Sequence, residues 1–106
     1  MDIYNKYLLL LKEYFNKAGW ENYFLFGGCY WFANLIHEKL PDSYLVINRV
    51  EEHCAICIDG KIYDVRGQIP NYNFHKATKR EISFMKKNYK PQFDVSNLEV
   101  FLEKNV

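Results

Sequence analysis

The stretch HCAICIDGKIYD, residues 53–64, decides the fold because it predicts a tight β-hairpin. Two β-prone runs flank Asp59-Gly60, a dipeptide that favours the two-residue turn of a hairpin. Pairing of the strands across this turn makes His53 and Asp64 diagonal neighbours on one face. Their Cβ atoms are then less than about 7–8 Å apart, so a histidine ring and a carboxylate can meet there.

The same alternation of side chains separates Cys54 from Cys57. Residues three apart on a strand point to opposite sides, so this Cys-x-x-Cys pair cannot bind one zinc ion together. Redox pairs of this type sit at the start of a helix, whereas this pair lies in a predicted strand. We interpret both residues as small buried hydrophobic side chains, with metal and redox roles as minor alternatives. The sequence predicts no metal site and no cofactor.

The segments before the hairpin predict two helices and a further strand. Apolar residues at helical spacing predict a helix over residues 3–18, with Gly19 as its C-terminal cap. A second helix is expected to begin near Cys29 and to end before Pro41. The β-prone run YLVINRV, residues 44–50, then predicts a strand beside the hairpin.

Two short helices are predicted after the hairpin. The tetrapeptides TKRE, residues 78–81, and SNLE, residues 96–99, both match the capping box. In that motif a hydroxyl and a carboxylate reciprocally satisfy free amides at a helix start. His75 lies between the hairpin and the first of these helices, in a segment that we interpret as a polar loop.

Length and composition predict one compact domain, residues 1–106, since the chain is 49% hydrophobic and has no linker or repeat. The formal net charge of +1 gives no overall attraction to nucleic acid or to an anionic membrane. The N-terminal MDIYNKYLLLLKEYF is neither a secretory signal nor a membrane span. We therefore expect a cytoplasmic protein with free thiols that recognises a protein or peptide. The oligomeric state stays open.

Cys29 differs from the other two cysteines because it opens a predicted helix. The helix dipole and the free amides at that position favour a thiolate nucleophile, and the same amides can stabilise an oxyanion. Gly27-Gly28 leaves room for a substrate backbone. Simple burial in the core is the alternative for a lone cysteine. The predicted pairing of His53 with Asp64 supplies the base and the orienting carboxylate that a thiol nucleophile needs, and favours catalysis.

The run FGGCYWFANLI, a strand-borne His53 and the run DGKIYDVRG together resemble the Cys-His-Asp core of the papain-like superfamily. The likeness is strongest to the transglutaminase-like branch, in which a Gly-x-Cys-aromatic run opens the central helix. The chain is also similar to small bacterial and phage proteins of that type. The resemblance covers residues 22–67. It implies that Cys29 is the nucleophile, His53 the general base and acid, and Asp64 the residue that orients the imidazole.

The sequence departs from that pattern at two places. Papain-type enzymes carry an oxyanion-hole glutamine six residues before the nucleophile, where this chain has Tyr23 with Asn22 beside it. We assign Asn22, Tyr23 and Gly28 as candidate oxyanion or substrate-binding residues. The interval between His53 and Asp64 is also shorter than in large transglutaminases.

These observations predict an α+β fold, in which a central Cys-bearing helix packs on a small antiparallel sheet with flanking helices. The predicted function is acyl transfer or hydrolysis through a Cys29 thioester, acting on an amide, an isopeptide or a glutamine side chain. The alternative is a non-catalytic binding protein, for example a phage-encoded inhibitor or adaptor, that uses the same scaffold.

Overall fold

The computed structural model describes residues 3–15, 24–25, 28–91 and 93–105. The helices within these residues are α1 (Ile3–Phe15), α3 (Cys29–Lys39), α4 (Lys79–Asn88) and α5 (Val95–Asn105). The strands are β1 (Tyr44–Asn48), β2 (His53–Ile58), β3 (Lys61–Asp64), β4 (Gly67–Ile69) and β5 (His75–Lys76). None of the helices in the described ranges combines the length and the apolar character needed to cross a bilayer.

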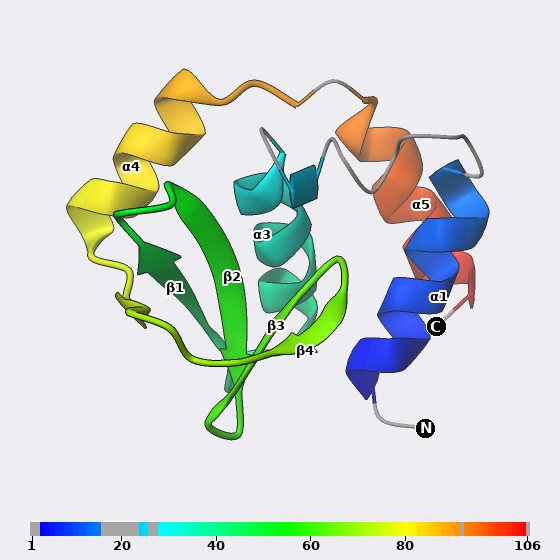
Figure 1. The fold of residues 1–106 in the computed structure, drawn as a ribbon. Helices are drawn as coiled ribbons and strands as arrows, with labels where there is room; N and C mark the ends of the chain where they lie inside the picture. Colours follow the sequence, from blue (N-terminus) through cyan, green and yellow to red (C-terminus); the bar gives the residue numbers. More distant parts are fainter. Residues whose placement is uncertain (1–2, 16–23, 26–27, 92, 106) are drawn as a thin grey trace.

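The five strands form one antiparallel sheet in the order β4-β3-β2-β1-β5. Helix α3 packs against one face of this sheet, mainly against β2, while α1 and α5 lie side by side (Figure 1). Helix α4 lies on the side of β1 (Figure 1). The architecture is therefore the predicted α+β class, with the Cys29-bearing helix on a small antiparallel sheet.

The hairpin has the register that the sequence predicts. Ile58 pairs with Lys61 and Ile56 with Tyr63, so the turn consists of two residues. Asp59 and Gly60 both have positive φ angles, 52° and 78°. This is the backbone of a type I′ turn, which matches the natural twist of the two strands and favours glycine at its second position.

Strand β2 is buried on both faces, because a separate cluster of apolar side chains covers each one. The face toward α3 belongs to the main core, which contains Cys54, Ile56, Ile58, Tyr63 and Val65. The opposite face carries a smaller cluster, made of Val46, Ala55, Cys57 and Ile62 with Ile69 and Phe74 against it.

Helix α3 begins at Cys29 and ends at Lys39, as predicted. Helix α1 ends at Phe15 within the described residues, and the rest of the predicted 3–18 helix and its cap Gly19 lie outside them. Strands β4 and β5 are short and were missed, so His75 lies in a strand and not in a loop. Only two or three residues form each of these strands, too few for a β-pattern to stand out.

One of the two predicted capping boxes is present. The Thr78 side chain accepts a hydrogen bond from the Glu81 amide at 3.1 Å, and the Glu81 carboxylate accepts one from the Thr78 amide at 3.0 Å. The prediction at residues 96–99 is wrong, because α5 already begins at Val95. Asp94 accepts the hydrogen bond from the Asn97 amide at 3.0 Å, which starts the helix before Ser96 can act as its cap.

Candidate active site

Cys29 is the first residue of α3 and is partly exposed to solvent. The backbone N–H of Cys54 donates a hydrogen bond to the Cys29 Sγ atom at 3.4 Å. The residue before it, Gly28, is the N-cap of the helix and has no side chain to satisfy the first amides. The sulfur therefore lies at the start of a helix, where amide dipoles favour negative charge on the sulfur or on an oxyanion beside it.

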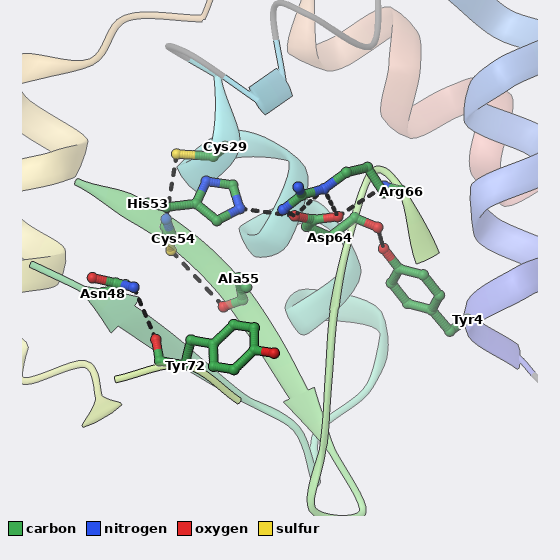
Figure 2. A network of polar contacts seen from close by, with 9 residues as sticks. All are labelled: Tyr4, Cys29, Asn48, His53, Cys54, Ala55, Asp64, Arg66 and Tyr72. Carbon is green, nitrogen blue, oxygen red and sulfur yellow. Dashed lines mark hydrogen bonds and ion pairs between the residues drawn. The ribbon is translucent and has the colours of Figure 1, made fainter. Parts of the chain in front are cut away.

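His53 begins β2 and is 7% exposed. Its Nε2 atom lies 2.9 Å from the Asp64 Oδ2 atom, in the pairing that the hairpin register predicts. The ring lies between the Cys29 side chain and the Asp64 carboxylate, and its second nitrogen faces the sulfur (Figure 2). Cys29 on α3, His53 on β2 and Asp64 at the end of β3 thus lie in one row, although they come from three different elements.

The surroundings of His53 favour its imidazolium form. Burial alone would lower the pKa of His53, but the hydrogen bond with Asp64 and the interactions with Cys29 raise it from 6.5 to about 9. These interactions favour the protonated, positively charged ring. A cation beside the Cys29 sulfur stabilises a thiolate, the form of cysteine that attacks carbonyl groups.

Asp64 is 3% exposed and binds Arg66 as well as His53. The Arg66 guanidinium donates from Nη2 to Oδ2 at 2.5 Å and from Nε to Oδ1 at 3.2 Å. The Arg66 amide also donates to Oδ1, at 2.8 Å. Burial opposes ionisation, but the hydrogen bonds from His53 and Arg66 lower the pKa of Asp64 from 3.8 to about 2. The carboxylate is therefore ionised throughout the physiological range.

An arginine that follows a strand is most often a solvated side chain. Arg66 contacts Asp64, although more than half of its side chain is exposed. The buried hydroxyl of Tyr4 on α1 donates to the Asp64 carbonyl, a contact over 60 residues that no local pattern signals. Side chain and backbone of Asp64 are thus both held in place.

The other cysteines do not join this line of residues. Cys54 lies in the main core and Cys57 in the smaller cluster, on opposite faces of β2 as the alternation predicts. Burial, with a smaller effect of Cys29, raises the pKa of the Cys54 thiol well above its usual range. Among the described residues, no group of three or more potential metal ligands comes together.

Of the three candidate oxyanion residues, only Gly28 lies within the described residues. Its φ angle of −104° is one that any residue adopts, and its carbonyl accepts a hydrogen bond from the Phe32 amide at 3.0 Å. Asn22 and Tyr23 lie outside the described residues. The two other histidines have partners outside this site. His37 hydrogen-bonds the Ser43 hydroxyl at 2.9 Å, and His75 binds Glu81 at 3.0 Å.

Fold and site together define a small α+β protein with a cysteine, a histidine and an aspartate aligned at one end of the sheet. The chain belongs to the phage YunG-like protein family, whose model matches residues 7–103. This membership agrees with the phage or bacterial origin expected from the sequence. No curated protein and no solved structure matches the chain.

Proposed function

We propose that this protein is a thiol-dependent acyl-transfer enzyme or hydrolase on a papain-like, transglutaminase-like scaffold. The observation that carries the proposal is the position of the His53 ring, between a partly exposed Cys29 and an ionised Asp64 (Figure 2). Nucleophile, base and orienting group stand in the order that covalent catalysis by a thiol requires.

The first half-reaction forms a thioester. The Cys29 thiolate attacks the carbonyl carbon of an amide, an isopeptide or a glutamine side chain, and the carbonyl electrons move onto oxygen. Amides at the start of α3 stabilise this oxyanion. When the oxyanion collapses, the carbon–nitrogen bond breaks and the His53 imidazolium gives its proton to the leaving nitrogen. Ammonia or an amine departs, and the acyl group stays on the sulfur.

The second half-reaction releases the acyl group. Neutral His53 takes a proton from water or from an acceptor amine, which attacks the thioester carbon. The carbon–sulfur bond then breaks, and the thiolate–imidazolium pair is restored. Asp64 stays ionised throughout and hydrogen-bonds the Nε2 atom of the ring, so that Nδ1 stays directed at the sulfur.

The proposal includes a protein or peptide substrate and a cytoplasmic setting. A reducing compartment keeps cysteines as thiols, and Cys29, Cys54 and Cys57 are all free. Asn22 and Tyr23 stay candidates for additional oxyanion donors, since each side chain carries a hydrogen-bond donor.

Selective alkylation tests the nucleophile. Cys54 and Cys57 are 2% and 4% exposed, whereas Cys29 is partly exposed and lies beside a cation. With iodoacetamide near neutral pH, Cys29 should react faster than either buried thiol, and His53→Ala should slow Cys29 alone. Peptide mapping of folded protein by mass spectrometry gives the three rates. Equal rates for the three cysteines would contradict the proposal.

A non-catalytic binding protein is the second candidate, and the exposed face of α4 favours it. This face presents Phe84, which is 60% exposed, among cationic side chains that are also exposed. The exposed cations of the helix are Lys79, Arg80, Lys86 and Lys87. Cys29→Ala separates the candidates in a partner or phenotype assay. Loss of function with intact partner binding supports the enzyme, and full function in Cys29→Ala supports the binder.

A further inference from the structure

Residues Pro70–Phe74 cross the face of the sheet that is opposite α3. Strands β4 and β5 are the two edges of the sheet, so the chain that joins them passes over the strands between (Figure 1). This segment, called the strap below, bends on its way, because the Tyr72 amide donates to the Pro70 carbonyl at 3.1 Å and Asn73 has a φ of 58°.

One buried side chain holds the middle of the strap. Asn48, the last residue of β1, is 2% exposed, and its Nδ2 atom donates to the Tyr72 carbonyl at 2.8 Å (Figure 2). Its Oδ1 atom accepts hydrogen bonds from the amides of Val50 at 3.0 Å and Glu51 at 3.1 Å. A single amide group thus joins the strap to the turn between β1 and β2.

The strap lies against His53. Asn48 is the cross-strand partner of His53, and the Phe74 ring contacts the imidazole edge to face, with 6.2 Å between ring centroids. Phe74 also packs on the small apolar cluster of that face. Helix α3 covers the other face of the sheet, so the strap explains why a polar histidine at the end of a strand is only 7% exposed.

We propose that Asn48 is a positioning residue of the active site, which acts by holding the strap across the sheet and Phe74 against His53. The catalytic consequence rests on the proposed function, whereas the mechanical role of Asn48 does not. With the strap in place, water cannot reach the imidazole from this face, and the ring cannot turn away from Asp64. Hydrogen bonds between charged groups are stronger when water is excluded.

Substitution of Asn48 by Asp tests the clamp. Asn48→Asp keeps an acceptor for the Val50 and Glu51 amides but removes the donor to Tyr72. Asn71→Asp is the matched control, because the Asn71 Oδ1 atom accepts from the Phe74 amide at 3.3 Å and a carboxylate can still accept. Amide hydrogen exchange of residues 72–76 by NMR should accelerate about tenfold or more in Asn48→Asp and change little in Asn71→Asp. Equal exchange in the two variants would overturn the proposal.

Phe74→Ala tests the effect on the catalytic histidine without adding charge. The titrating groups that face His53 are Asp64 from β3 and Cys29 from α3, and Arg66 acts on it through Asp64. Water admitted by the variant screens these interactions and also relieves the burial that lowers the pKa of His53, so the NMR titration midpoint of His53 should differ measurably from that of wild type. Phe74→Leu, which keeps an apolar contact on the sheet, is the variant to measure if Phe74→Ala does not fold. Its midpoint should move in the same direction.

These readouts separate the two proposals. The exchange and titration experiments do not depend on Cys29 chemistry, so an unchanged His53 midpoint in Phe74→Ala or Phe74→Leu overturns the role of the strap alone. Unselective alkylation of wild-type protein overturns the proposed function alone. If both proposals hold, the Phe74 variants should also alkylate Cys29 several-fold more slowly than wild type at neutral pH.

Discussion

Asp64 connects the candidate catalytic residues Cys29 and His53 to the rest of the protein. Its carboxylate binds both His53 and the Arg66 guanidinium, while its carbonyl accepts a hydrogen bond from the Tyr4 hydroxyl. A carboxylate with these partners is fixed in orientation and in charge. At the scale of single residues, the site is therefore a hydrogen-bonded unit that extends beyond Cys29, His53 and Asp64.

Arg66→Gln should lower the stability of the protein in a pH-dependent way. Because the folded pKa of Asp64 is depressed, its contribution to stability is present above 3.8 and is lost as the pH falls through about 2. Without the guanidinium this depression is smaller, so the variant is less stable than wild type above pH 3.8. The difference should shrink as the pH approaches 2.

Urea denaturation across this acid range measures the effect of Arg66→Gln. Arg80→Gln, on the exposed face of α4, removes the same charge away from Asp64 and serves as the control. A constant stability difference between wild type and Arg66→Gln over the whole range would show that Arg66 does not act through Asp64.

His53 should make stability fall on the alkaline side. Its folded pKa is raised from 6.5 to about 9, so its contribution is fully present below 6.5 and is lost as the pH rises through about 9. His53→Gln should lack this part of the decline. Unfolding free energies of both proteins, measured at pH values below 6.5 and above 9, give the comparison. Parallel curves would contradict the raised pKa.

At the scale of elements, the β2–β3 hairpin sets the geometry of the site, since its register determines which side chains meet. Gly60 has a φ of 78°, and an added Cβ would meet no atom within 4 Å, so backbone strain is the main cost of a substitution there. Gly60→Val should destabilise the fold by about 1 kcal/mol or more, because a β-branched residue resists positive φ. Gly60→Asn should cost less, since asparagine tolerates this conformation.

Thermal unfolding of wild type and the two Gly60 variants measures these costs. An unchanged melting temperature for Gly60→Val would mean that the turn, and with it the register that pairs His53 and Asp64, is wrong.

Local patterns predicted the hairpin, α3 and the cap of α4 because each depends on residues close together in the sequence. The start of α5 was misplaced because two capping candidates, Asp94 and Ser96, lie two residues apart, and only the fold selects between them. Edge strands β4 and β5 pair through backbone groups over two or three residues, which leaves no side-chain period to detect.

The candidate site likewise contains residues that local patterns predict and residues that they do not. The His53–Asp64 pair follows from a two-residue turn and strand alternation, and Cys29 follows from its position at a helix start. The roles of Arg66, Tyr4 and Asn48 depend on side-chain conformations or on contacts between distant segments. A hydroxyl from α1 reaching Asp64, or an amide from β1 reaching Tyr72, has no signal in the local sequence.

At the scale of the whole molecule, each face of the sheet is covered by a different segment, and the two segments have different roles. Helix α3 delivers the thiol from one side, and the strap covers the imidazole from the other (Figures 1 and 2). The described residues thereby bury the His53–Asp64 pair between these two segments.

Formation of an acyl-enzyme on Cys29 tests the central claim most directly. Folded protein is mixed with p-nitrophenyl acetate as a generic acyl donor, and intact mass followed by peptide mapping locates the acetyl group. We predict transient acetylation of Cys29, none at that site in Cys29→Ala, and slower formation in Asp64→Asn, whose histidine is present but poorly oriented. Acetylation that avoids Cys29, or that is equally fast at Cys54 and Cys57, would contradict the assignment of Cys29, His53 and Asp64 as a catalytic unit.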